Sequence, residues 1–252
     1  MPFTVSHAAA VLPFRKLNLV WSAFIVGSMA PDFPYVVGTT EYRSLGHRPP
    51  GLLLFTIPVA FAVLWLYHRV IKRPVIDLLP RGVQARLPAD AGEFTFAGRM
   101  PAISASLLLG IATHIVWDSF THSFTWAWRN VGWLHRRVEI PFLGAVPGYS
   151  ALQYISTIIG LLALAIWVWL WYRESPAAAA VPRSRFAVAV VMFSFATVAG
   201  FARAAIVVGA PATRARADVF LLVFATTALA LAFWQLVLYC VLVSMRQAWT
   251  LY

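Results

Sequence analysis

Three polar residues, His114, Asp118 and His122, stand four residues apart in an otherwise apolar stretch. Residues four apart share one helix face, so these side chains would form a stripe two turns long if the helix continues. Imidazole nitrogens and a carboxylate oxygen on neighbouring turns can hold one Zn²⁺ or a similar divalent ion. The alternative is a hydrogen-bonded pair, His114 with Asp118, between packed helices.

Further histidines and aspartates interrupt the apolar sequence before this stripe. His7 lies in a short apolar run, Asp32 ends one apolar segment, and His47 precedes the next. Ionisable residues at membrane depth are costly and are functional candidates by default. With helices alternating in direction, Asp32 and His47 lie on the same membrane side as Asp118, and a re-entrant N-terminal hairpin brings His7 beside His114. We therefore predict a metal site here, with Asp32 as a ligand or as the general base.

A second pair, His135 and Glu139, has the same spacing in a Trp-rich loop. Together with His122 it could hold another ion. The alternative is a solvated loop in which Glu139 forms an ordinary salt bridge with Arg136 or Arg137.

The composition indicates a membrane protein. Of 252 residues, 61% are hydrophobic and 12% charged, with a mean hydropathy of +0.75. Soluble domains carry about 25% charged residues, so this chain has too little polar surface to coat a globule in water. The net charge of +11 arises from short basic runs between apolar stretches, near anionic head groups. No basic helix or aromatic-basic platform predicts nucleic-acid binding.

Apolar segments long enough to cross a bilayer recur along the chain, since a spanning helix needs about 20 such residues. We expect an all-α, polytopic helix bundle with about six transmembrane helices. Five clear spans are residues 51–70, 101–120, 151–171, 186–208 and 219–243. A sixth starts at residue 19 and ends near Ala30, before two prolines. The run 3–14 is too short to span and suits a short re-entrant or interfacial helix.

The polar motifs lie in the N-terminal part of the chain, whereas the C-terminal part carries almost no polar residues in its apolar segments. We expect a metal-site-bearing helical domain at residues 1–172, a linker at 173–185 and two C-terminal transmembrane helices within 186–252. With six spans, twelve of the 20 lysines and arginines fall on the side of the termini and eight on the other. The excess predicts that both termini are cytoplasmic.

Four short motifs occur in order: PFTVSH ending at His7, GSMAPD ending at Asp32, Gly46-His47, and GIATHIVWDSFTH ending at His122. On these motifs, residues 1–172 resemble a bacterial family of multi-pass membrane proteins of unknown function, related to membrane-bound metal-dependent hydrolases. The resemblance implies a hydrolase in the bacterial cytoplasmic (inner) membrane.

More remotely, the order His, Asp, His, HxxxD, His, HxxxE is similar to the zinc-dependent phospholipase C and single-strand nuclease superfamily. This similarity implies ligands for two zinc ions, namely His7, Asp32, His47, His114 and Asp118. It also implies a third ion, held by His122, His135 and Glu139. Two features depart from that pattern: Met1 is not obviously processed to a metal-binding N-terminal residue, and Asp118 and His122 are unusually close in sequence.

We therefore hypothesise a metal-dependent hydrolase that acts at the membrane face on a phosphoester, such as a membrane lipid or lipid-linked phosphate. Arg43, Arg48 and Arg129 could bind an anionic head group. The rival hypothesis is a non-catalytic protein with a structural metal or an ion or proton pathway. Pathway residues should line successive depths of the bilayer, whereas these gather at one end. The sequence does not predict an oligomeric state.

Overall fold

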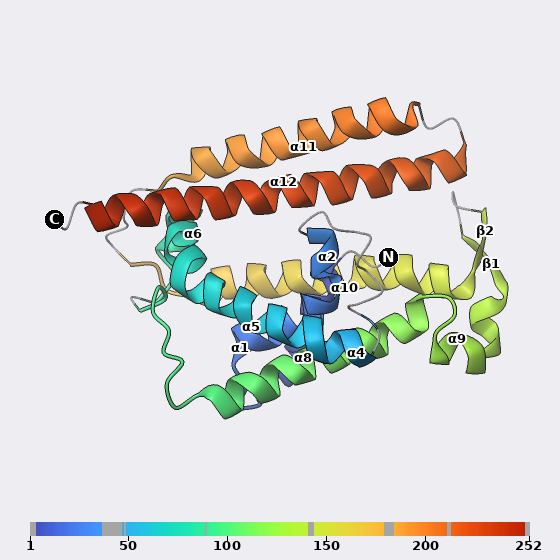
Figure 1. The fold of residues 1–252 in the computed structure, drawn as a ribbon, viewed down its shortest axis with the longest axis horizontal. Helices are drawn as coiled ribbons and strands as arrows, with labels where there is room; N and C mark the ends of the chain where they lie inside the picture. Colours follow the sequence, from blue (N-terminus) through green and yellow to red (C-terminus); the bar gives the residue numbers. More distant parts are fainter. Residues whose placement is uncertain are drawn as a thin grey trace. The chain divides into compact units, whose positions relative to one another are not determined.

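The computed structural model describes residues 4–36, 47, 49–88, 90–140, 144–178, 184–210 and 213–249. Helices account for most of these residues, as the all-α prediction expects (Figure 1). In chain order the first elements are η1 Thr4–Phe14, α1 Trp21–Met29, η2 Ala30–Asp32 and α2 Phe33–Val36. The next are α4 Pro49–Gly51, η4 Leu52–Thr56, α5 Ile57–Leu66, η5 Tyr67–Ile71, α6 Lys72–Leu78 and α7 Arg81–Gln84. Then come α8 Met100–Thr121, α9 Trp126–Asn130 and η6 Gly132–His135. They are followed by β1 Arg137–Ile140, β2 Gly144–Pro147, α10 Gly148–Glu174, α11 Phe186–Val208 and α12 Arg214–Trp249.

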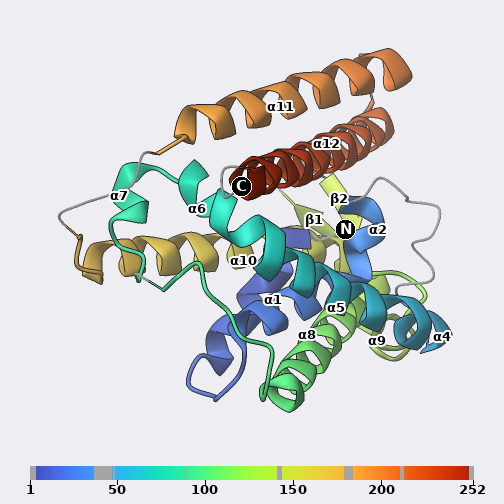
Figure 2. The same cartoon turned by 60° about the vertical axis from the view of Figure 1, so that its left-hand side comes forward.

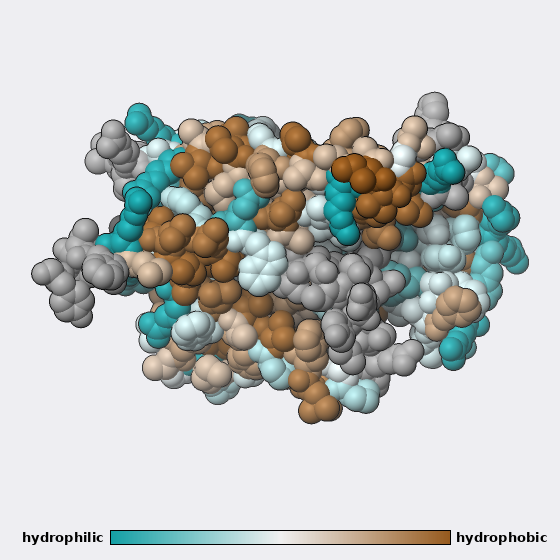
Figure 3. Space-filling view, turned by 45° about the horizontal axis from the view of Figure 1, so that its top comes forward, coloured by the Kyte–Doolittle hydropathy of each residue, from teal (hydrophilic) through white to brown (hydrophobic). Residues whose placement is uncertain are grey.

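Within the described ranges, five helices are long and apolar enough to cross a bilayer. They are Leu52–Leu78, Met100–Asn130, Gly148–Glu174, Phe186–Val208 and Arg216–Arg246. Many of their exposed side chains are large and apolar, and hydrophobic residues form patches on the face drawn in Figure 3. The prediction of a multi-pass membrane protein is thus supported by both length and surface.

The count of six spans is not confirmed. The segment that begins at residue 19 forms α1, which has only 9 residues. At 1.5 Å per residue it is about 14 Å long, against a hydrocarbon core of about 30 Å. The short N-terminal helix does form, as the 3-10 helix η1 over Thr4–Phe14.

The chain forms two compact units, each assembled from three separate stretches. The first comprises Met1–Asp32, Ser44–Leu64 and Thr95–Glu174, and the second Phe33–Arg43, Trp65–Phe94 and Ser175–Tyr252. The division of the chain at residues 172 and 186 stays a prediction.

In the first unit, α1 and α8 pack with their backbones in contact, and they lie side by side in Figures 1 and 2. A Cβ on Gly27 would collide with the carbonyl of Leu107, and one on Gly110 would collide with the carbonyl of Phe24. Only glycine at both positions allows this approach. The start of α1 is tied to α8 by Val20 N–H, which donates to Ser106 Oγ over 2.8 Å.

η1 is held against α10 by another close contact. A Cβ on Gly160 of α10 would lie 3.0 Å from the Ser6 carbonyl oxygen. His7, the next residue along η1, is thereby buried within the first unit.

The loop predicted after residue 120 also contains a short antiparallel hairpin, in which β1 pairs with β2 and Val138 faces Val146. This hairpin was not predicted.

In the second unit, α11 and α12 form a packed helical pair (Figure 1). Small buried residues, Ala196, Gly200 and Ala204, repeat every four residues along α11. A Cβ on Gly200 would lie 3.0 Å from the Phe224 carbonyl oxygen. Such small-residue contacts are how transmembrane helices approach closely.

Candidate metal centre

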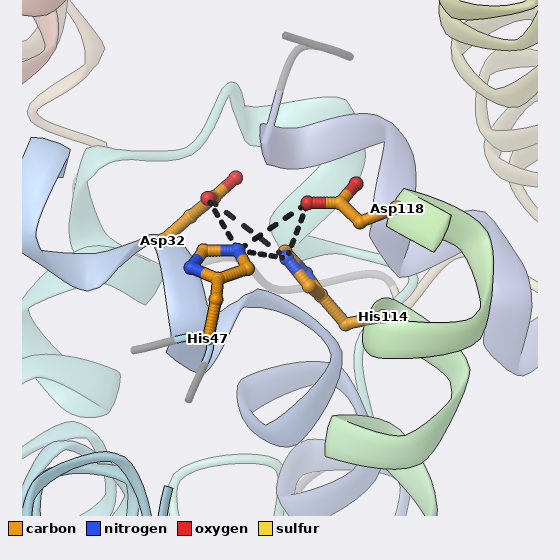
Figure 4. A group of neighbouring side chains, drawn as sticks. All are labelled: Asp32, His47, His114 and Asp118. Atoms are coloured by element: carbon orange, nitrogen blue, oxygen red, sulfur yellow. Dashed lines mark hydrogen bonds and ion pairs between the residues drawn. The ribbon is translucent and has the colours of Figure 1, made fainter. Parts of the chain in front are cut away.

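Four of the predicted ligands converge in the first unit. One ligand atom from each of Asp32, His47, His114 and Asp118 lies within 4.8 Å of the other three. Figure 4 shows Asp32 and His47 facing His114 and Asp118, which both project from α8. Asp32 ends η2, and His47 lies just before α4. These three chain segments therefore meet at one place, whereas their position relative to a membrane side stays a prediction.

The distances between these atoms suit a common cation. His114 Nε2 lies 3.2 Å from Asp118 Oδ2 and 3.3 Å from His47 Nε2. His47 Nε2 is 3.3 Å from Asp118 Oδ2, and Asp32 Oδ1 is 3.8 Å from His47 Nε2 and 3.9 Å from His114 Nε2. With metal–ligand bonds of about 2.0–2.1 Å, the edge of a regular tetrahedron is about 3.3 Å. The atoms of His47, His114 and Asp118 match this edge, and Asp32 Oδ1 lies somewhat further out as a fourth donor.

The orientation of His114 follows from the contact between α1 and α8. His114 Nδ1 lies 2.8 Å from the carbonyl oxygen of Ser28. A carbonyl only accepts hydrogen bonds, so Nδ1 carries a proton, and in the neutral ring the lone pair of Nε2 would face the cluster. Metal-bound histidines are typically oriented in this way. Ser28 reaches the ring because Gly110, one turn before His114, carries no side chain.

Asp32 is almost fully buried, at 1% exposed. Its Oδ2 accepts a hydrogen bond of 3.0 Å from the Thr4 hydroxyl, which leaves Oδ1 directed at the cluster. Burial raises the pKa of this carboxyl above its ordinary value, because a lone negative charge is poorly solvated there. A cation bound to Oδ1 would remove that penalty.

His7 adjoins the four-residue group. Its ring stacks on that of His114 with centroids 4.0 Å apart, and its Nε2 lies 3.5 Å from Asp118 Oδ1. Burial, together with the neighbouring His114, lowers the pKa of His7 to about 3. His7 is therefore neutral near pH 7, as a metal ligand must be.

Asp118 faces two sets of histidines. Its Oδ2 meets His47 and His114, whereas its Oδ1 lies 3.5 Å from both His7 Nε2 and His122 Nδ1. α8 ends at Thr121, so the helical stripe does not extend to His122, which instead follows in an extended conformation. His122 nevertheless turns back onto Asp118.

The other predicted residues lie outside this group. His135 is exposed in η6, where its ring meets that of Trp128 edge-on at 4.1 Å, and Glu139 is exposed on β1. Among the described residues, only the Asp32, His47, His114 and Asp118 group brings three or more such ligand atoms within 4.8 Å. Arg129 is exposed in α9, while Arg43 and Arg48 lie outside the described residues.

The donor chemistry fits a divalent cation better than a self-contained polar pair. Asp32 Oδ1, Asp118 Oδ1 and His7 Nε2 are buried, and the described part of the structure gives none of them a hydrogen bond. Unsatisfied buried polar atoms are costly, whereas imidazole nitrogens and carboxylate oxygens are good ligands for such ions. The residues present can therefore hold a metal ion.

Sequence reasoning missed the groups that orient these ligands. Neither the Thr4 hydroxyl nor the Ser28 carbonyl was singled out, although both lie within quoted motifs. The glycines at 27 and 110 were the available signal, because a glycine inside an apolar helix often marks a close backbone approach.

A family model described as a domain of unknown function (DUF4184) matches residues 1–241. The chain therefore belongs to this family. The comparisons with curated proteins and with solved structures found no match.

Proposed function

We propose that this member of the DUF4184 family is a metal-dependent hydrolase of the membrane face, with zinc as its metal and a lipid or lipid-linked phosphoester as its substrate. One observation carries the proposal: two buried carboxylates, a buried imidazole and a half-buried imidazole from three chain segments converge with ligand-like spacing. A structural protein has little need for two buried aspartates at one point, because each buried charge costs free energy.

In this proposal Asp32, His47, His114 and Asp118 hold the first ion. His7 and Asp118 Oδ1 hold a second, in line with the resemblance to zinc-dependent phosphoesterases. A third ion at His122, His135 and Glu139 would require these residues to move together, because they do not form a ligand group in the described structure. Bound zinc supplies Lewis-acid polarisation of a phosphoryl oxygen and a water of lowered pKa.

The chain's own residues would bind and orient the substrate. His47 is the most accessible member of the group, with 22% of its side chain exposed, so substrate would approach from its side. Arg43, Arg48 and Arg129 are proposed to bind the anionic head group, since guanidinium groups recognise phosphate by paired hydrogen bonds. Asp32 acts as a ligand through Oδ1 or as the general base.

Metal analysis of the detergent-purified protein tests the site. We expect stoichiometric metal in the wild type and its loss in His114→Ala and Asp118→Ala. His68→Ala is a matched control, because His68 is also buried but stacks on Phe94 in the second unit. A wild type that carries no stoichiometric metal would rule out the hydrolase.

A substrate screen then separates an enzyme from a structural metal protein. Metal-loaded protein is incubated with soluble aryl phosphates, phosphodiesters and lipid phosphates, and phosphate release is measured. Release that is lost after chelation and restored by zinc supports the hydrolase. A fully metal-loaded protein that hydrolyses none of these compounds favours the rival, a structural metal site. Asp32→Asn distinguishes the two roles of Asp32. If Asp32 is the general base, the variant loses activity but keeps its metal, whereas if Asp32 is a ligand, the variant loses metal as well.

A further inference from the structure

An apolar groove runs beside the metal cluster in the first unit. It has a volume of about 360 Å³, which is in the range of small-molecule sites. One wall is formed by Ala10 and Phe14 of η1. The other is formed by residues of α8, namely Leu109, Ala112, Thr113, Val116 and Trp117.

The α8 wall is one face of that helix, because its residues recur at spacings of three and four. His114 and Asp118 immediately follow Thr113 and Trp117, so the ligand face lies about 100° around the same helix. Thr113 adds little polarity, since its hydroxyl donates to the Gly110 carbonyl over 2.7 Å.

The groove ends close to the cluster. The Trp117 ring meets the His7 ring edge-on, with centroids 6.5 Å apart, and His7 Nε2 is 3.5 Å from Asp118 Oδ1. In a 3-10 helix residues three apart share a face, so η1 directs His7 to the cluster and Ala10 to the groove.

The length of the groove suits a single alkyl chain. From Leu109 to Trp117, eight residues of helix advance about 12 Å. Carbon–carbon bonds of about 1.5 Å in a zigzag advance about 1.25 Å each, so roughly ten methylene groups match this span.

We propose that this groove binds one alkyl chain of the substrate, with the phosphate at the cluster and the chain between η1 and α8. The inference rests on the proposed function, because it takes the cluster as the phosphate site. An apolar groove that leads to a metal-bearing centre would complement an amphiphile with a phosphate head, because phosphate oxygens can bind the metal. Val116 is 61% exposed on a candidate membrane span, so a lipid chain could enter sideways from the bilayer.

A non-hydrolysable photoprobe tests this assignment without relying on catalysis. The probe is decylphosphonate with a diazirine at the end of its chain, added to metal-loaded protein in nanodiscs. Labelled residues are identified by mass spectrometry. We expect labelling around Leu109 and Phe14, competed by decylphosphonate and not by ethylphosphonate.

Two phenylalanine variants provide the contrast. Ala112→Phe fills the groove and should reduce labelling about tenfold. Ala105→Phe is the matched control, because Ala105 is exposed on the same helix but does not line the groove. It should label like the wild type, and both variants should keep their metal.

The outcomes separate this inference from the proposed function. Labelling that survives Ala112→Phe, or that is unchanged when the metal is removed, overturns the groove as the chain site. The latter result would mean that the groove holds ordinary bilayer lipid. Metal-dependent phosphate release without groove labelling overturns the inference and leaves the hydrolase standing. Purified protein without metal overturns the proposed function itself.

Discussion

At the scale of single residues, the candidate centre depends on groups that fix ligands as much as on the ligands. Thr4 directs one oxygen of Asp32 away from the cluster, and the Ser28 carbonyl fixes the proton of His114. Such supporting hydrogen bonds lock the geometry and raise the basicity of the ligand atoms. Their loss should weaken metal binding without removing a donor.

Thr4→Val tests this support at Asp32. The substitution keeps the shape of the side chain but removes the 3.0 Å hydrogen bond to Oδ2. We expect metal affinity to fall about 10- to 100-fold, the usual effect of losing such a partner. Competition with a chelator of known affinity measures the change. Thr4→Ser retains the hydroxyl and should bind almost normally, so equal losses in both variants would contradict the role of the hydrogen bond.

The ligand residues of the site could be predicted from the sequence, but the groups that orient them could not. The alternation of helices was enough to predict that Asp32, His47, His114 and Asp118 meet, because polar residues in apolar segments have few other partners. The Ser28 carbonyl could not be predicted, since every residue has a carbonyl and only the crossing of α1 and α8 selects this one. The apolar groove likewise depends on how η1 lies on α8.

At the scale of elements, the glycine contact between α1 and α8 determines where the cluster forms. The two backbones touch at Gly27 and Gly110, and His114 lies one turn further along α8. The length of the apolar stretch 101–120 predicted α8, whereas the sequence did not predict that α1 would have only 9 residues and be followed by the short turns η2 and α2. Pro31 lies in η2 and Pro34 in α2, so the regular α-helix gives way at the prolines to a 3-10 turn that ends at Asp32 of the cluster.

Gly110→Ala tests the element contact. The added Cβ would lie 2.7 Å from the Ser28 backbone nitrogen, so α1 must move away from α8. Overpacking of this kind costs about 1–3 kcal/mol, and the shift should also lengthen the hydrogen bond between Ser28 and His114. We expect a lower thermal midpoint in detergent together with weaker metal binding.

Gly132→Ala is the matched control, because a Cβ there would meet nothing within 4 Å. It should leave both the thermal midpoint and metal binding unchanged. If Gly110→Ala behaves like this control, the glycine contact does not position His114.

At the scale of the whole molecule, the apolar surface makes the chain a membrane protein, and its charges predict how it is oriented. Composition alone was sufficient to predict a membrane protein, because a chain with so few charged residues has too little polar surface to be soluble in water. The number of spans was harder to predict, since an apolar segment interrupted by proline can either cross the bilayer or end within it.

Reporter fusions test the predicted orientation. With twelve basic residues on one side and eight on the other, both termini should be cytoplasmic. A green fluorescent protein at either terminus should therefore fluoresce, and alkaline phosphatase fused after Asn130 should be active. Termini on opposite sides would contradict the prediction and would fit the five spanning helices without a sixth.

The short helix α1 has one more consequence, for the order in which ligands bind. Ser28 lies in its last turn, where backbone carbonyls carry partial negative charge. This helix end adds to the charges of Asp32 and Asp118, so the metal-free centre repels phosphate. We expect compulsory-order kinetics, with the cation binding before any phosphate-bearing ligand and leaving only after it.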